Sequence, residues 1–173
     1  KEITLTYGQA VVDVASLGFE NVGYTFVGFA EDKNLNADAA LSGDISAWIL
    51  AKLEAGEELK LFAKWIAKTN TKYTIKYYME GTTQGTFPLA GSYSLEGMTA
   101  DTVTVTAEQV VAHETATDFT GYVFDEGTTA GKNSGVILAD GTQVLEVYFK
   151  RVRPIISFDL NKAEGTTGDI SVA

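Results

Sequence analysis

Apolar and polar residues alternate along most of the chain, and this period of two is typical of β-strands. The alternating segments are rich in Thr, Val, Ile and Tyr, which are favoured in strands because they pack well on a pleated surface. They predict strands over residues 2–7, 24–30, 58–66, 72–79, 86–95, 102–106, 121–125, 134–139, 143–151 and 154–159.

Two segments carry helix signals instead. Asp44 is a predicted N-cap, and Gly56 follows the predicted last turn of the longer helix. Between them, apolar residues recur at helical spacing at Ile45, Trp48, Ile49 and Leu53. Thr106 and Gln109 have the spacing of a capping box, which predicts a short second helix that begins after Thr106.

Turn signals separate several of the predicted strands. Asp140-Gly141 stands between the strands predicted over 134–139 and 143–151, and this dipeptide is a strong hairpin signal because its glycine accepts positive φ angles. We therefore predict that these two strands pair as a hairpin. The tetrapeptide Glu-Gly-Thr-Thr occurs three times, and we interpret it as turn chemistry at Glu80, Glu126 and Glu164.

One four-residue pattern occurs twice. Gly23-Tyr24-Thr25-Phe26 recurs as Gly121-Tyr122-Val123-Phe124. Each copy is followed later by an alternating segment with basic and aromatic residues near its end, over 59–65 in one case and 145–151 in the other. The recurrence predicts an internal repeat of one structural unit.

Each predicted unit has a few strands, one helix and a final strand, so we expect an α+β fold in which a helix covers one face of a sheet. The units are expected to end near Ile66 and Val152. A unit of roughly 65 to 80 residues buries only ~60% of its unfolded surface, so contacts with its neighbours would help it. The spacers over 67–71 and 151–154 are short and have no Gly-rich tract, which favours a semi-rigid rod.

Composition narrows the possible functions. A net charge of −10, with 13 scattered basic residues among 173, argues against nucleic-acid binding, which needs clustered Lys and Arg. The absence of cysteine excludes disulfides, thiolate nucleophiles and cysteine-ligated zinc. No apolar run approaches the ~18 residues of a membrane span. A hydrophobic content of 45% is enough to build packed cores.

Catalytic groups are sparse. His113 is the only histidine, and no predicted partner accompanies it in the way that a nucleophile and its base would. The adjacent acids Asp125-Glu126 and Glu57-Glu58 would point to opposite faces of a strand, so neither pair suits glycoside hydrolysis. We predict no catalytic residue, no cofactor and no enzymatic activity.

One polar segment imitates a calcium-binding loop. Its alternating oxygen-bearing residues are Asp32, Asn34, Asn36 and Asp38. However, Ala37 stands where an EF-hand loop has its turn-forming Gly, and Gly43 stands where it has its bidentate Glu. The segment is therefore either a calcium candidate or a polar loop of turn-forming residues, and the second interpretation is favoured.

A group of aromatic residues is the candidate ligand-binding surface. It comprises Tyr73, Tyr77, Tyr78, Phe87 and Tyr93. These rings would form a platform for stacking sugars if they shared one exposed face of a sheet. The alternative, which such residues more often adopt, is that they are core residues and cross-strand partners.

The first half of the chain resembles the Listeria-Bacteroides repeat, the internalin-type B-repeat. That family usually reads Gly-Tyr-Thr-Phe-x-Gly-Trp and ends in Leu-x-Leu-Tyr-Ala-Lys-Trp. Here residues 23–29 read Gly-Tyr-Thr-Phe-Val-Gly-Phe, and residues 59–65 read Leu-Lys-Leu-Phe-Ala-Lys-Trp. Phe29 replaces the usual Trp, and the helix predicted over 44–55 resembles an insertion into the standard repeat.

The second half resembles the mucin-binding-protein (MucBP) repeat, over residues 73–78, 121–124, 134–137 and 145–151. Both families are implied to adopt ubiquitin-like β-grasp folds in adhesins on the surface of Gram-positive bacteria. The resemblance implies tandem β-grasp modules in an elongated arrangement. It also implies a protein that is extracellular and attached to the bacterial cell wall.

The resemblance divides the chain into three parts. Residues 1–68 would be a B-repeat-like unit that lacks its first strand, 69–152 a MucBP-like unit, and 153–173 the opening strand of a further B-repeat. The implied function is a stalk or spacer in adhesion. The alternative is a module that binds mucin-type glycans or a host surface protein directly. Neither function involves nucleic acid or insertion into a membrane.

A unit without its first strand has a consequence for assembly. Its last strand, over 58–65, would lack a parallel neighbour and would expose hydrogen-bonding groups along one edge. The segment from Ile155 to Asp159 of one molecule would then complete the first unit of the next. The sequence therefore predicts head-to-tail self-association, which grows into chains unless it closes.

Overall fold

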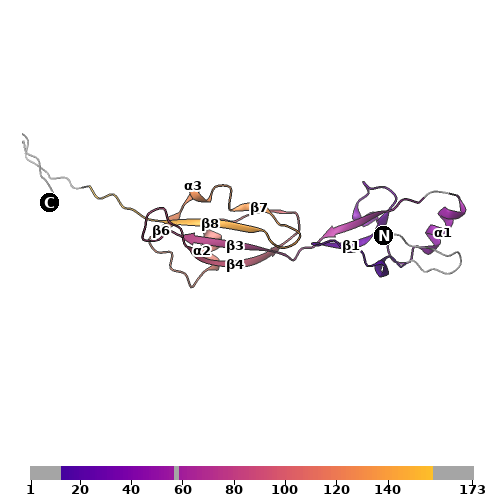
Figure 1. Cartoon of the computed structure of the whole chain (residues 1–173), viewed down its shortest axis with the longest axis horizontal. Coiled ribbons are helices and arrows are strands. Elements are labelled where there is room, and N and C mark those ends of the chain that lie inside the picture. Colours follow the sequence, from indigo (N-terminus) through magenta and orange to yellow (C-terminus); the bar gives the residue numbers. More distant parts are fainter. Residues whose placement is uncertain (1–12, 57–58, 158–173) are drawn as a thin grey trace, which may run out of the picture.

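Three sheets and three α-helices make up the described part of the chain, and its class is α+β, as predicted. A computed structural model describes residues 13–56 and 59–157 (Figure 1). Within these residues there are eight strands. The predicted strand over 2–7 and the turn predicted at Glu164 lie outside the described residues.

The first sheet consists of two antiparallel strands, β1 (Tyr24–Ala30) and β2 (Phe62–Ala67). Between them in sequence come a 3-10 turn, η2 (Ala37–Ala39), and the helix α1 (Ser46–Glu54), while η1 (Val14–Leu17) precedes β1. Four buried hydrophobic residues of this part of the chain pack together, namely Val14, Phe29, Ile45 and Ile49. They form a hydrophobic cluster of their own, joined by the partly buried rings of Phe19, Phe26 and Trp48.

Helix α1 ends where its sequence predicts, but its N-cap is Ile45 and not the predicted Asp44. The Asp44 carboxylate still accepts a hydrogen bond of 2.9 Å from the backbone N–H of Ser46, which satisfies this donor of the first turn. After the helix, Gly56 has a φ of +76° and its N–H donates to the carbonyl of Leu53. Leu53 itself is 50% exposed, so the buried stripe is narrower than predicted.

The largest sheet has four strands in the order β4-β3-β8-β6. Its bounds are β3 (Thr71–Met79), β4 (Leu89–Gly97), β6 (Tyr122–Phe124) and β8 (Val144–Arg151). β3 and β8 are parallel neighbours, whereas β4 and β6 pair with them antiparallel. A separate two-stranded antiparallel sheet joins β5 (Thr102–Thr104) to β7 (Ser134–Val136).

Alternation along β3 and β8 builds the second hydrophobic cluster. The inward residues of these strands are Tyr73, Ile75, Tyr77, Leu145, Val147 and Phe149, all buried. Helix α2 (Ala107–His113) covers this face with Val110, which is fully buried. The predicted capping box of α2 is confirmed, because the side chains of Thr106 and Gln109 each accept from the other's backbone N–H.

The predicted hairpin between the segments flanking Asp140-Gly141 is wrong. The turn itself is present, since the N–H of Gly141 donates to the carbonyl of Leu138 at 2.9 Å. However, β7 pairs with β5, and β8 pairs with β3 and β6. Because β8 is an inner strand with both edges occupied, it has no edge left for β7.

Several other boundaries differ from the prediction. β2 begins at Phe62 and not at 58, and β7 ends at Val136 and not at 139. Residues 154–157, predicted as the start of a strand, lie outside the strands of the structure. Glu126 begins a short helix, α3 (Glu126–Thr129), whereas the sequence predicted a turn there.

The repeated pattern Gly-Tyr-x-Phe has the same place in the sheet of β1 and β2 as in the four-stranded sheet. In the first sheet Tyr24 pairs with Ala67 and Phe26 with Trp65. In the second, Tyr122 pairs with Arg151 and Phe124 with Phe149. The strand β1 thus has the position of β6, and β2 has the position of β8.

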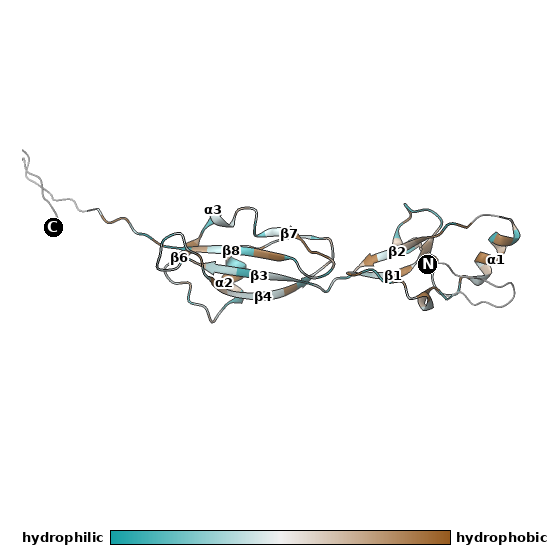
Figure 2. Cartoon of the chain, viewed as in Figure 1, coloured by the Kyte–Doolittle hydropathy of each residue, from teal (hydrophilic) through white to brown (hydrophobic). Residues whose placement is uncertain are grey.

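The two hydrophobic clusters follow one another along the long axis of the molecule (Figure 1). Apolar residues lie in both parts of the chain and are not confined to one of them (Figure 2). Only three residues, 68–70, separate the end of β2 from the start of β3. Because β3 and β8 are parallel, the chain enters the four-stranded sheet at one end and leaves it at the other.

The core around β8 gives a direct test of this fold. Leu145 is 0% exposed, so Leu145→Ala should lower the free energy of unfolding by about 2–5 kcal/mol, through lost burial and an unfilled cavity. Leu138→Ala is the matched control, because Leu138 is 44% exposed and should change stability by less than about 1 kcal/mol. Urea unfolding followed by circular dichroism measures both, and equal losses would contradict the assigned core.

Candidate functional site

The five predicted aromatic residues do not share one surface. Tyr73 and Tyr77 are 8% and 2% exposed and belong to the core, and Tyr93 packs against the same cluster. Tyr78 and Phe87 instead contact Tyr148, which lies on the opposite face of the sheet. Alternation along β3 causes this split, since neighbouring residues of a strand point to opposite faces. The five residues therefore do not form a single platform, and Tyr73, Tyr77 and Tyr93 instead follow the favoured interpretation of core residues and cross-strand partners.

The outer face carries a smaller aromatic group, in which the predicted Tyr78 and Phe87 surround Tyr148, a residue that was not among the candidates. The rings of Tyr78 and Tyr148 stack with centroids 4.6 Å apart, and Lys132 Nζ lies 4.4 Å from the Tyr148 centroid. Both hydroxyls donate to the Glu146 carboxylate, at 3.0 and 2.8 Å. Burial and the neighbouring Glu146 carboxylate raise the pKa of Tyr148 to about 12, so its phenol remains a donor. Neighbours within the chain thus occupy both the ring and its hydroxyl.

His113, the only histidine of the chain, lies at the edge of a surface hollow. Its ring stacks on Tyr93 with centroids 3.7 Å apart, and its Nδ1 lies 3.2 Å from a Glu114 carboxylate oxygen. The hollow, of about 290 Å³, is lined mainly by aromatic and aliphatic side chains of β3, β4 and β5. The histidine ring thus packs against Tyr93 of β4.

The calcium candidate residues lie on an exposed loop between β1 and α1. The Asp32 carboxylate accepts a hydrogen bond of 2.8 Å from the backbone N–H of Asn34, and Asp38 lies within η2. Within residues 13–56 and 59–157, no three His, Asp or Glu side chains are grouped so that they would hold a metal ion. The hydrogen bond of Asp32 is that of a turn-forming residue.

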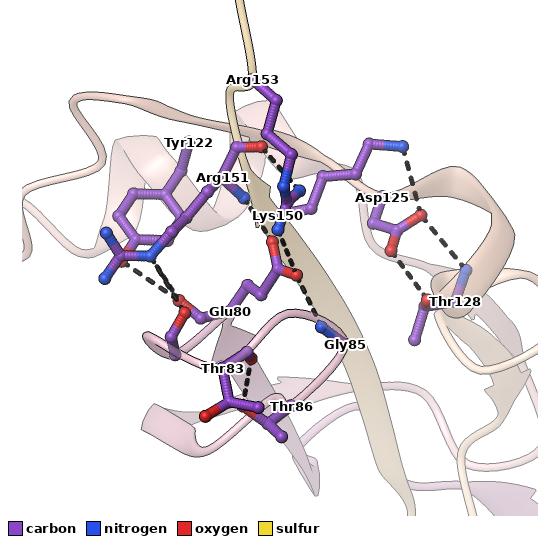
Figure 3. A network of polar contacts seen from close by, with 11 residues as sticks. Glu80, Thr83, Gly85, Thr86, Tyr122, Asp125, Thr128, Lys150, Arg151 and Arg153 are labelled. Atoms are coloured by element: carbon purple, nitrogen blue, oxygen red, sulfur yellow. Dashed lines mark hydrogen bonds and ion pairs between the residues drawn. The ribbon is translucent and has the colours of Figure 1, made fainter. Parts of the chain in front are cut away.

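Glu80, at the end of β3, holds the most heavily bonded carboxylate of the described residues (Figure 3). Its side chain is 3% exposed. One oxygen accepts from the Gly85 N–H and from Arg153 Nη2, both at 2.7 Å, and the other accepts from the Arg151 N–H at 2.9 Å. The Arg153 guanidinium and these two N–H groups lower the pKa of Glu80 to about 2.

The backbone of Glu80 extends the same network. Its N–H donates to the Phe149 carbonyl at 2.8 Å, and its carbonyl accepts from Tyr122 Oη and from Arg151 Nε. Glu80 thereby joins the end of β3 to the segment through which the chain leaves β8. Glu80 precedes a turn, as predicted, but nothing local to it in the sequence indicates these distant partners.

A second polar cluster lies where the sheet of β1 and β2 meets the four-stranded sheet, a contact that we call the junction. Thr99, which follows β4 and is 3% exposed, donates from Oγ1 to the Gly23 carbonyl at 2.7 Å. Since a carbonyl only accepts, the Thr71 hydroxyl must donate to Thr99 Oγ1, at 2.6 Å. The Thr99 N–H donates to the Lys68 carbonyl, and the Lys68 N–H donates to the Gly23 carbonyl, both at 2.9 Å.

Gly23 is also the point of closest packing at this junction. A Cβ atom at Gly23 would lie 2.7 Å from Ala139, which is too close for any side chain. Its φ of +76° likewise favours glycine. The junction, defined by Gly23, Lys68, Thr71, Thr99 and Ala139, is therefore a packed and hydrogen-bonded contact.

Comparison with known proteins adds no family to this geometry. No protein-family model, curated protein or solved structure matches the chain. Among the described residues, no helix is both long enough and apolar enough to cross a bilayer.

The Glu80 network predicts a specific pH dependence of stability. The folded pKa of about 2 lies below the ordinary 4.5, so the ionised carboxylate stabilises the fold fully above pH 4.5 and loses this effect as the pH falls through 2. Glu80→Gln should therefore be less stable than the parent at neutral pH, because an amide N–H would face the donors of Arg151 and Arg153. The difference should shrink between pH 4.5 and 2.

Urea unfolding across this pH range measures the effect. Glu96→Gln is the matched control, because it removes the same charge from an exposed position on β4. It should leave both the stability and the pH slope close to those of the parent. A Glu80→Gln variant with the parent's pH slope would show that the carboxylate has no such role.

Proposed function

We propose that this chain is a repeat segment of a secreted, cell-wall-attached bacterial surface protein and serves as a stalk or spacer in adhesion. The observation that carries the proposal is the junction, where the buried Thr99 bonds to Gly23 and Lys68. A spacer must hold its parts at a fixed distance, and a bonded junction with a three-residue connection resists bending. The resemblance of the sequence to repeats of bacterial adhesins supplies the biological setting.

The four-stranded sheet and its helix are proposed to be a ubiquitin-like β-grasp unit of the MucBP type, over 69–152. The strand order β4-β3-β8-β6 supports this, because the first and last strands of the unit form a parallel central pair. Residues up to 68 are proposed to belong to a related B-repeat unit. The matched pairing of β1 with β2 and of β6 with β8 supports that relationship.

The parallel pair also suits a protein that carries tension. When the two ends of the four-stranded sheet are pulled apart, β3 and β8 slide past one another in opposite directions. The six paired positions from Thr74–Val144 to Met79–Phe149 then share the load, instead of opening one after another. Glu80 adds bonds to Arg151 and Arg153 at the point where the chain leaves β8.

The alternative function is direct binding of mucin-type glycans or of a host surface protein. The outer-face group of Tyr78, Phe87, Lys132, Glu146 and Tyr148 favours it, because it combines aromatic rings with charged groups. The stalk remains the first proposal, because residues of the chain already occupy the Tyr148 ring and hydroxyl that a sugar would contact. Tyr78 and Lys132 lie against the ring, and Glu146 accepts from the hydroxyl.

Head-to-tail self-association through Ile155 to Asp159 stays a prediction. Ile155 and Ile156 are 93% and 71% exposed, and within the described residues β2 has β1 as its only strand partner. Both features support the pairing, although residues from 158 onward lie outside the described part. Light scattering over a concentration series tests it, and a chain that stays monomeric throughout would contradict it.

The junction can be tested through the distance between the two parts of the chain. Since there is no cysteine, Glu54→Cys and Glu126→Cys introduce a unique pair of spin labels at exposed positions. The parent should give one narrow distance distribution. Thr99→Val keeps the shape of the side chain but removes its hydrogen bonds, so it should broaden the distribution and cost about 1–3 kcal/mol of stability.

Thr82→Val is the matched control for this measurement, because Thr82 is exposed and lies at the opposite end of β3 from the junction. It should leave the distance distribution unchanged. A broad distribution in the parent would contradict a fixed junction and, with it, the proposed stalk.

Binding separates the two proposed functions. A stalk should give no signal on an array of mucin-type glycans, whereas a binding module should give a signal that Tyr148→Ala reduces by about tenfold, as expected for loss of a stacked ring. The exposed Val123→Ala is the control and should leave any signal unchanged. Glycan binding that depends on Tyr148 would overturn the stalk in favour of the alternative.

A further inference from the structure

The far end of the four-stranded sheet repeats the geometry of the junction. Gly23 and Gly121 each precede their strand with a φ of +76° and +79°. The Gly23 carbonyl accepts from the Lys68 N–H at 2.9 Å, and the Gly121 carbonyl accepts from the Val152 N–H at 2.8 Å. The same backbone arrangement thus occurs at the end of β1 and β2 and at the end of β6 and β8.

The two ends differ in what covers them. Gly23 is buried under Thr99 and Ala139, whereas Gly121 is exposed and a Cβ atom there would meet nothing within 4 Å. A carbonyl oxygen has two lone pairs, and that of Gly23 uses both, for Lys68 and for Thr99. Among the described residues, the Gly121 carbonyl bonds to Val152 alone, so its second lone pair is open.

We propose that Gly121 and Val152 form a docking surface for a unit built like residues 71–152. Such a unit would place the equivalent of Thr99 on the carbonyls of Gly121 and Val152, and the equivalent of Ala139 on the bare face of Gly121. This inference rests on the proposed stalk function and specifies its contact. It implies that successive units are joined by one repeated set of bonds.

The segment that leaves the sheet supports this occupant. Three residues, 68–70, connect β2 to Thr71, and three residues, 152–154, connect β8 to Ile155, which therefore has the position of Thr71. The direction of this segment is fixed, because Arg153 bonds to the buried Glu80 carboxylate and Pro154 holds the residue before it extended. Ile155 and Ile156 follow with 93% and 71% of their surfaces exposed, as expected of strand residues that a further unit would cover.

The test extends the full chain by the proposed occupant. Residues 1–154 are followed directly by a second copy of residues 71–152, so that the copy's Thr71 takes the place of Ile155. Spin labels at Glu126→Cys in the original and in the copy should give one narrow distance distribution. Hydrogen exchange at the backbone amide of residue 99 in the copy should be about tenfold slower, or slower still, with Thr99 than with Thr99→Val. In that variant the loosened contact no longer protects the hydrogen bond from this amide to the Val152 carbonyl.

The first junction of the same extended chain is the internal control, measured in a second sample labelled at Glu54→Cys and Glu126→Cys of the original. A broad distribution across the new junction, with a narrow one across the first, would overturn the docking surface and leave the stalk intact. Broad distributions across both would contradict the proposed function itself. A copy that fails to fold would also count against the docking surface, because the original of the same sequence folds against the equivalent surface.

Discussion

The parallel pairing of β3 with β8 is the constraint on which the rest of the structure depends. Of the four strands in this sheet, β3 comes first and β8 last along the chain, and the two lie side by side at its centre. Their inward residues form the centre of its hydrophobic cluster. Two parallel strands that are neighbours must be connected by a crossover, which here supplies α2 and places it over the inner face. The same pairing sends the two ends of the sheet in opposite directions. An elongated molecule follows from this pairing, without any special linker.

Buried polar groups then fix the chain segments that enter and leave the four-stranded sheet. At one end, Thr99 satisfies the carbonyls of Gly23 and Lys68, and at the other, Glu80 satisfies Gly85, Arg151 and Arg153. An unpaired group in either place would cost more than its bond contributes, so each cluster favours a single geometry. The polar clusters fix the direction of the chain at both ends of the sheet, and they add to the stability that the hydrophobic clusters supply.

The features that could be predicted from the sequence are those that interactions between neighbouring residues decide. β1, β3 and the capping box of α2 were predicted closely, because alternation and capping are read from neighbouring residues. Strand pairing depends on the whole sheet, so the turn at Asp140-Gly141 was predicted and the hairpin was not. The contacts of Glu80 and Thr99 join residues 71 and 76 positions apart, and no local pattern indicates them. The repeated Gly-Tyr-x-Phe, together with the alternating segment that follows each copy, predicted where the first unit ends and so where the junction lies.

The central claim is that the parts before and after residues 68–70 move as one body. Residual dipolar couplings of backbone N–H groups in β1 and β2, and separately in β3, β4 and β8, measure this directly in a chain of 173 residues. A fixed junction predicts that both sets fit a single alignment tensor with the same magnitude and orientation. Two tensors of different magnitude would show that the parts tumble independently, and would contradict the account.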